Sequence, residues 1–240
     1  MSAAAPDLDV SRETLDRLKA LLELAARWTR RINLVSAGSL QDGWRRHIVD
    51  SVQVHRAAPA AAHWVDLGTG GGFPGLVVAI LEAERAHPAR VTLVESDERK
   101  GAFLRTALRE CEVAAEVLTR RVEAVPPLAA DVLSARALAP LDRLLAYAER
   151  HLAPGGTAIF PKGARWREEI DAAEQNWSFK AETIPSITDA DAVLLRIGEI
   201  SRAPRQSQSA PDHRHRESEG GRGQDDNSDQ PGRGAGKGRA

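Results

Sequence analysis

Five glycines fall within the eleven residues Val65–Gly75, and this segment has an apolar run on each side. Glycine has no Cβ, so the backbone can adopt positive φ angles and approach a ligand closely. The helix that follows would begin near Pro74 and point unpaired backbone N–H groups at that ligand. The pattern predicts a strand, a ligand-binding turn and a helix, because a plain surface turn seldom needs so many glycines.

Two acidic residues are expected beside the same ligand. Glu95 ends the second predicted strand, where a carboxylate can accept hydrogen bonds from both hydroxyls of a ribose. This arrangement fits either a dinucleotide or S-adenosylmethionine. Phe73 stands where a dinucleotide pattern counted from Gly68 has its third small residue. Asp66 adds a negative charge that suits the methionine ammonium better than a pyrophosphate, so we favour S-adenosylmethionine.

The spacing of apolar residues along the chain predicts the helices and strands that position these residues. Residues 11–32 and 40–55 predict two amphipathic helices, capped by Ser11 and Ser39. From residue 64 onward, short apolar strands alternate with helices. Strands are expected at 64–67, 91–95, 115–118, 132–135, 157–160, 179–184 and 192–197, and helices at 75–86, 98–110, 141–151 and 164–174. This order predicts an α/β fold with a doubly wound, mainly parallel sheet, an antiparallel last strand pair and an N-terminal helical extension.

Composition limits the class of protein. The 240 residues carry a formal net charge of −1, so charge alone indicates no partner. The single cysteine, Cys111, cannot form an intrachain disulfide, which suits a reducing cytosol. The chain has no apolar run of about 18 residues and no signal-peptide pattern. We therefore expect a cytoplasmic protein with no membrane partner.

The chain should divide into three parts. Residues 1–60 would form the helical extension and residues 61–200 the ligand-binding domain. Residues 201–240 consist mainly of Arg, Gly, Ser, Gln, Asp and Pro, which bury too little apolar surface to offset the entropy of ordering. A disordered tail is expected there, either as a solvated extension or as a nonspecific RNA contact.

Several segments resemble the glucose-inhibited division protein B family, bacterial methyltransferases that act on N7 of a guanine in 16S ribosomal RNA. Asp66–Gly75 resembles the family's cofactor loop. Arg46-His47-Ile48-Val49-Asp50-Ser51, preceded by Asn33-Leu34, resembles its N-terminal signature and makes the match specific. Further similar segments are Glu95–Leu104, Ser134–Ala137 and Pro161–Gly163. The resemblance covers about residues 10–198 and implies the class I S-adenosylmethionine-dependent methyltransferase fold.

The resemblance also implies cofactor contacts. Gly68 and Phe73 would touch S-adenosylmethionine, and a side chain at Gly70 would fill the space of the cofactor. Asp66 and Glu95 would flank the same cleft.

Further contacts are implied after the third and fourth strands. Val122 and Glu123 would hold the adenine through a backbone N–H and an acceptor, although Glu123 alone reads as part of a solvated helix face. Arg136 would line the cofactor pocket, facing the methionine carboxylate. The family's usual Ser-Arg-Ala is interrupted here by Ala135, so the role of Ser134 does not carry over.

Methyl transfer to guanine N7 requires few catalytic groups from the protein. The N7 lone pair is free in neutral guanine, so alignment of N7 with the methyl group is the main catalytic task. We therefore predict no catalytic nucleophile and no metal.

Candidate RNA contacts each have a structural alternative. His47 would stack on a base or pack against Asp50 and Ser51 as structure. Lys100 and Lys162 would meet phosphates or remain ordinary surface charges. A basic patch or a set of solubility charges is expected around the two N-terminal helices, at Arg27, Arg30, Arg31, Arg45 and Arg46.

The predicted function is S-adenosylmethionine-dependent methylation of guanine N7 in 16S ribosomal RNA, with that RNA or the small ribosomal subunit as partner. One alternative is an NAD-dependent oxidoreductase, which Asp66 and Phe73-Pro74 disfavour. The other is a non-catalytic RNA-binding module on the same fold, which the intact glycine loop and Glu95 disfavour.

Overall fold

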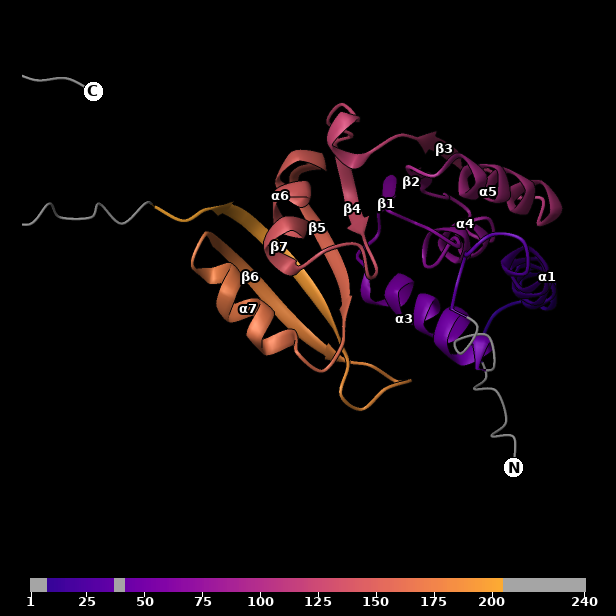
Figure 1. Ribbon diagram of the computed structural model, residues 1–240, viewed down its shortest axis with the longest axis horizontal. Coiled ribbons are helices and arrows are strands. Elements are labelled where there is room, and N and C mark those ends of the chain that lie inside the picture. The colour runs from indigo at the N-terminus through magenta and orange to yellow at the C-terminus, as the bar shows by residue number, and fades with distance from the viewer. Residues whose placement is uncertain (1–7, 37–41, 205–240) are drawn as a thin grey trace, which may run out of the picture. The chain divides into compact units, whose positions relative to one another are not determined.

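The computed structural model describes residues 8–36 and 42–204, all within one compact unit, Met1–Arg205 (Figure 1). Seven strands of the described chain form one sheet in the order β3-β2-β1-β4-β5-β7-β6. All neighbouring pairs are parallel except those of β7, which runs antiparallel to β5 and β6. The predicted doubly wound, mainly parallel sheet is confirmed.

The element bounds lie close to the expected ones. The strands are β1 His63–Leu67, β2 Arg90–Glu95, β3 Glu116–Thr119, β4 Ala130–Ser134, β5 Leu152–Lys162, β6 Trp177–Pro185 and β7 Val193–Arg202. The helices are α1 Arg12–Thr29, the π-helical turn η1 Trp44–Val49, α3 Asp50–Ala57, α4 Gly75–Glu82, α5 Glu98–Glu110, the 3₁₀ turn η2 Val122–Ala124, α6 Leu141–His151 and α7 Trp166–Glu174.

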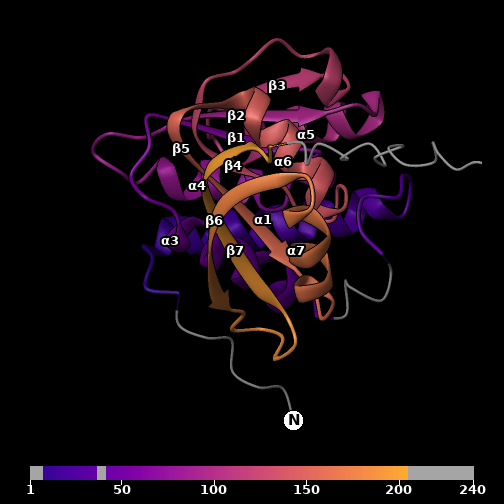
Figure 2. The same cartoon turned by 90° about the vertical axis from the view of Figure 1, so that its left-hand side faces the viewer.

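The sheet separates two apolar cores, because successive side chains of a strand point to opposite faces. Trp64 packs with the core beneath α1, α3, α4 and α5, whereas the next residue, Val65, packs with the core beneath α6. Figure 2 looks at the β6 edge of the sheet and shows α3 and α7 on opposite sides of β6 and β7. This layering leaves the strand ends accessible for a site.

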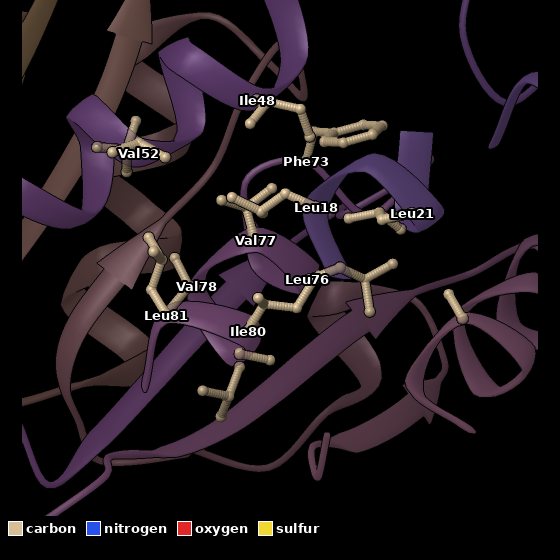
Figure 3. Close-up of a cluster of buried hydrophobic side chains, with 14 of the residues drawn as sticks. Leu18, Leu21, Ile48, Val52, Phe73, Leu76, Val77, Val78, Ile80 and Leu81 are labelled. Atoms are coloured by element: carbon tan, nitrogen blue, oxygen red, sulfur yellow. The ribbon is translucent and has the colours of Figure 1, made fainter. Parts of the chain in front are cut away.

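Helix α4, which follows the glycine loop, is buried on all sides. Its apolar side chains cluster with Leu18 and Leu21 of α1 and Val52 of α3, as Figure 3 shows. Phe73 and Ile48 extend this core toward η1. A helix that is apolar around its whole circumference is stable only in such a position, and it anchors the loop that precedes it.

The N-terminal helices belong to the same compact unit as the sheet. The predicted cap of α1 is confirmed, because the Ser11 side chain accepts a hydrogen bond from the Thr14 backbone N–H. The second predicted helix is present as η1 followed by α3. Its proposed cap, Ser39, lies outside the described residues.

The expected start of the tail at residue 201 is wrong. Strand β7 continues to Arg202, and Ser201 and Arg202 pair with Ser178 and Trp177 of β6. These residues have too few apolar neighbours in sequence to read as a strand, but they complete the backbone pairing with β6. The remainder of the expected tail, residues 205–240, lies outside the described residues.

Candidate functional site

The glycine loop joins β1 to α4 and has the backbone conformation expected of a ligand-binding turn. Gly70 has a φ angle of +55°, and a Cβ placed there would have only the Gly68 carbonyl oxygen nearby, at 3.8 Å. Gly72 has a φ of +85°, but a Cβ there would come within 2.2 Å of Leu76. Gly70 therefore borders open space, while Gly72 is closed off by the Leu76 side chain.

Asp66, near the end of β1, fixes the conformation of this loop. Its side chain is fully buried, and its carboxylate accepts hydrogen bonds from the Ser134 hydroxyl at 2.7 Å and the Gly75 backbone N–H at 3.1 Å. Asp66 and Ser134 are register partners in β1 and β4, which explains their contact. Burial raises the pKa of Asp66 to about 6. The contact of Asp66 with the methionine ammonium stays a prediction.

Ser134 has a structural role that the sequence did not predict. Its hydroxyl donates to Asp66 and accepts from the indole N–H of Trp64, so it joins β1 to β4 beneath the loop. Its position at the end of a predicted strand was the only available signal.

Glu95 connects the end of β2 to the glycine loop. One carboxylate oxygen accepts from the Gly70 backbone N–H at 2.9 Å, and the other accepts from the Asp97 backbone N–H at 2.8 Å. Each oxygen keeps a further lone pair, because a carboxylate offers about four acceptor sites. Glu95 thus lies beside Gly70, and its contact with a ribose stays a prediction.

Val122 and Glu123 lie in η2, just after β3. Val122 is buried, and the Glu123 side chain accepts hydrogen bonds from the Tyr147 hydroxyl and the Arg143 guanidinium. These donors, Tyr147 first, lower the pKa of Glu123 to about 2. The Glu123 carboxylate is therefore engaged within the protein, and an adenine contact there stays a prediction.

Arg136 follows β4 and points at η1. Its guanidinium donates to the Arg46 carbonyl oxygen at 2.8 Å and to Nδ1 of His47 at 3.1 Å. It also lies 5.7 Å from the centre of the Phe73 ring, on which His47 stacks with ring centres 4.8 Å apart. Burial, aided by Arg136 and Arg46, lowers the pKa of His47 to about 4, so the imidazole is neutral at physiological pH.

A cavity of about 1060 Å³ opens beside this cluster. It lies at the carboxyl ends of β4 and β5, and its lining includes Arg45, Asp50 and Lys162. Neither Gly70 nor Glu95 lines it. In open α/β sheets, ligands bind at the carboxyl ends of the strands near the point where strand order reverses, here between β1 and β4.

The cavity and the glycine loop share a wall, made by His47, Arg136 and Leu138. All three line the cavity. His47 and Arg136 contact Phe73 of the loop, and the Leu138 side chain lies 2.5 Å from the position that a Cβ on Gly68 would take. The wall therefore borders both the glycine loop and the cavity. Leu138 carries no polar group, and nothing in its sequence context indicated this role.

The expected RNA contacts are divided by the structure. Lys162 lines the cavity, but its ammonium donates to the Ala139 carbonyl at 3.2 Å and to Glu169 at 2.7 Å. His47 is buried and is part of the shared wall, and its contact with RNA stays a prediction. Lys100 is half-buried in α5 and does not line the cavity.

The five arginines of the expected basic patch are not all brought together. Arg45 and Arg46 are exposed and line the cavity. Arg27 instead faces Glu110 of α5 at 3.4 Å. Neither Arg30 nor Arg31 is among the residues that line the cavity.

A family model described as GidB, rRNA small subunit methyltransferase G, matches residues 14–194 of this chain. The chain belongs to this family. The ribosomal RNA small subunit methyltransferase G of Ruegeria sp. (strain TM1040) is 54% identical over 196 residues, covering 82% of this chain and 96% of the relative. That of Paramagnetospirillum magneticum is 47% identical over 194 residues, covering 80% and 92%.

Solved structures add a likeness of fold. Cofactor-bound Rv0187 from MTB has a TM-score of 0.52 at 16% identity, covering 82% of this chain and 98% of that one. The putative transferase PH0793 from Pyrococcus horikoshii also has a TM-score of 0.52, at 14% identity, covering 70% and 65%.

Membership of the small subunit methyltransferase G family confirms the predicted enzyme class, a class I methyltransferase with S-adenosylmethionine as cofactor. The oxidoreductase and non-catalytic alternatives are set aside on this ground. The described helices include none with the length and apolar character of a membrane span. The predicted absence of a metal stays a prediction.

Proposed function

We propose that this chain transfers the methyl group of S-adenosylmethionine to N7 of a guanine in 16S ribosomal RNA, in the cytoplasm. The observation that carries the proposal is the shared wall of His47, Arg136 and Leu138, which borders the glycine loop on one side and the cavity on the other. The printed names of the relatives, ribosomal RNA small subunit methyltransferase G, supply the class of acceptor.

The cofactor would lie over the glycine loop. Gly68 and Gly70 present backbone to it, Glu95 accepts from the ribose hydroxyls, and Val122 borders the adenine. Asp66 acts through the loop, because its carboxylate is already bound to Ser134 and Gly75.

When bound, S-adenosylmethionine supplies a methyl group already activated by its sulfonium. Guanine N7 carries a free lone pair, so the protein need not remove a proton before attack. The contribution of the chain is alignment, an effect worth about 7–11 kcal/mol at best. The methyl carbon and N7 must come within about 3–3.5 Å of each other for this transfer, so the two reactants would have to meet directly, beside Phe73 and Arg136.

The cavity offers groups that suit guanine. Asp50 lines it with a carboxylate able to accept from the N1–H and N2–H₂ donors of the base, while N7 lies on the opposite edge of the ring. Burial raises the pKa of Asp50, but its Thr188 hydrogen bond and the nearby Arg136 oppose that shift. The exposed Arg45 and Arg46 are placed to meet RNA phosphates near the cavity.

The test is methyl transfer from labelled S-adenosylmethionine to purified 16S ribosomal RNA and to small subunits, followed by nucleoside mass spectrometry. The expected product is 7-methylguanosine at one position. Asp50→Asn should lower kcat/KM for RNA while S-adenosylhomocysteine affinity stays near wild type, since the amide loses one acceptor. A label in any other nucleoside, or no label in either substrate, would overturn the proposal.

A further inference from the structure

The loop between β6 and β7 carries an apolar side chain into solvent beside the cavity. Ile187 is 62% exposed, and within residues 8–36 and 42–204 it is the large hydrophobic side chain that stands out in this way. Its neighbours Ser186 and Thr188 line the cavity, whereas Ile187 does not. A single exposed apolar residue is common on protein surfaces, so the contacts that hold the loop around Ile187 must carry the argument.

The loop is held in place by side chains of α3. The Gln53 side chain donates to the Pro185 carbonyl at 2.7 Å and accepts from the Ile187 backbone N–H at 3.1 Å. The Thr188 hydroxyl donates to Asp50, one helical turn before Gln53. Ile187 is therefore presented from a loop fixed on both sides of it.

The position of the loop relative to the site follows from strand direction. Because β7 is antiparallel to both β5 and β6, the carboxyl end of β6 lies at the same edge of the sheet as the carboxyl ends of β4 and β5. Figures 1 and 2 both show this loop protruding from that edge. Ile187 thus stands at the rim of the cavity proposed to receive the guanine.

A base within folded RNA must leave its stack to enter such a cavity. Proteins that unstack bases insert apolar side chains, isoleucine among them, next to the displaced base. The exposed Arg45 and Arg46 at the same cavity supply the positive charge that an RNA backbone requires.

We propose that Ile187 is a wedge that packs against the nucleotide next to the acceptor guanine and stabilises the unstacked state of the RNA. This inference rests on the proposed function for the identity of the acceptor. The occupant of the Ile187 surface is an RNA base, and Gln53 is a positioning residue that fixes the wedge.

The experiment compares Ile187→Ala, Ile187→Met and Gln53→Ala with wild type on two substrates: folded 16S ribosomal RNA and a short single-stranded RNA spanning the methylated guanine. Ile187→Ala should lower kcat/KM on folded RNA by about fivefold or more, with a clearly smaller loss on the single strand. Gln53→Ala should shift the ratio of the two rates in the same direction. Ile187→Met keeps the apolar bulk and should stay near wild type.

Equal losses on both substrates, or a loss for Ile187→Met as large as for Ile187→Ala, would overturn the wedge. The affinity of wild type and Ile187→Ala for folded RNA is measured in parallel and should fall in the variant. If wild type forms no 7-methylguanosine, the proposed function is wrong. The wedge is then tested by affinity alone: a lower affinity of Ile187→Ala for folded RNA supports it, and equal affinities contradict it.

Discussion

Arg136 and His47 are 89 positions apart in the chain, yet the guanidinium of Arg136 donates directly to Nδ1 of His47 at 3.1 Å. The same guanidinium donates to the Arg46 carbonyl oxygen. The end of β4 is thereby tied to η1 at the point where both meet Phe73 of the glycine loop. Turn η1 is connected to the glycine loop and to the end of β4 for this reason.

Arg136→Met should destabilise the protein and impair methyl transfer. It leaves two acceptors without their donor, which costs about 2–4 kcal/mol in the free energy of unfolding. Arg27→Met is the control, since the Arg27–Glu110 pair is about half exposed and should contribute less than about 1 kcal/mol. Urea unfolding of both variants measures the difference, and equal losses would contradict the role of Arg136.

Stability should depend on His47 at mildly acidic pH. The folded protein keeps this imidazole neutral down to a pKa of about 4, while the unfolded chain binds a proton from about pH 6.5 downward. The unfolded state therefore binds more protons between these values, and stability falls as the pH is lowered through them. The total effect is about 3 kcal/mol at most.

His47→Gln should remove this dependence. The difference in unfolding free energy between wild type and variant, measured from pH 4.5 to 7.5, should therefore shift in favour of the variant as the pH falls. Parallel curves would mean that His47 does not titrate as its surroundings indicate.

Gly70→Ala should separate cofactor binding from folding. A Cβ at Gly70 meets no packed side chain, so the cost to stability is the left-handed conformation alone, about 1–2 kcal/mol. Binding of S-adenosylhomocysteine, measured by calorimetry, should be lost because the methyl group occupies the ligand's space. Gly72→Ala should instead unfold more easily because of Leu76, and Gly198→Ala, with open space around it, should change neither property.

The arginines at the cavity should contribute to RNA affinity through charge. Arg45→Gln and Arg46→Gln should each weaken binding of 16S ribosomal RNA and reduce its salt slope by about 1 per lost phosphate contact. Arg27→Gln removes the same charge away from the cavity and should leave the slope unchanged. A slope that changes equally in all three variants would indicate a diffuse field rather than local contacts.

Truncation after Gly198 should destabilise the fold. It removes the end of β7, including Arg202, whose guanidinium lies 3.8 Å from the Trp177 ring centre. Trp177 is 2% exposed, so removing the residues that cover it should lower the free energy of unfolding by at least about 2 kcal/mol. Truncation after Pro204 keeps all of β7 and is the matched control. Thermal unfolding of both proteins measures the difference.

Much of the fold could be predicted because its signals are local. The glycine spacing, the acid at the end of β2 and the change of apolar period each depend on a few neighbouring residues. The end of β7 could not be recognised, because Ser201 and Arg202 are held by backbone pairing with β6 rather than by an apolar pattern.

The site was predictable only in part, for the same physical reason. The cofactor loop is a local motif, whereas the direction of Arg136 depends on η1 packing across it. A helical pattern places His47 on a helix but does not indicate which side chain of a distant loop it will stack on. Ser134 and Leu138 acquire their roles from register and packing, which no spacing in the sequence encodes.

The shared wall also limits how this enzyme could be re-engineered. Its members come from η1 and from the segment after β4, and they contact the glycine loop, so no contiguous stretch of chain carries the whole wall. A chimera that exchanged only the N-terminal helices would place a foreign residue against Phe73 and Arg136. Such a graft would have to move η1, the segment after β4 and the glycine loop together to preserve their contacts.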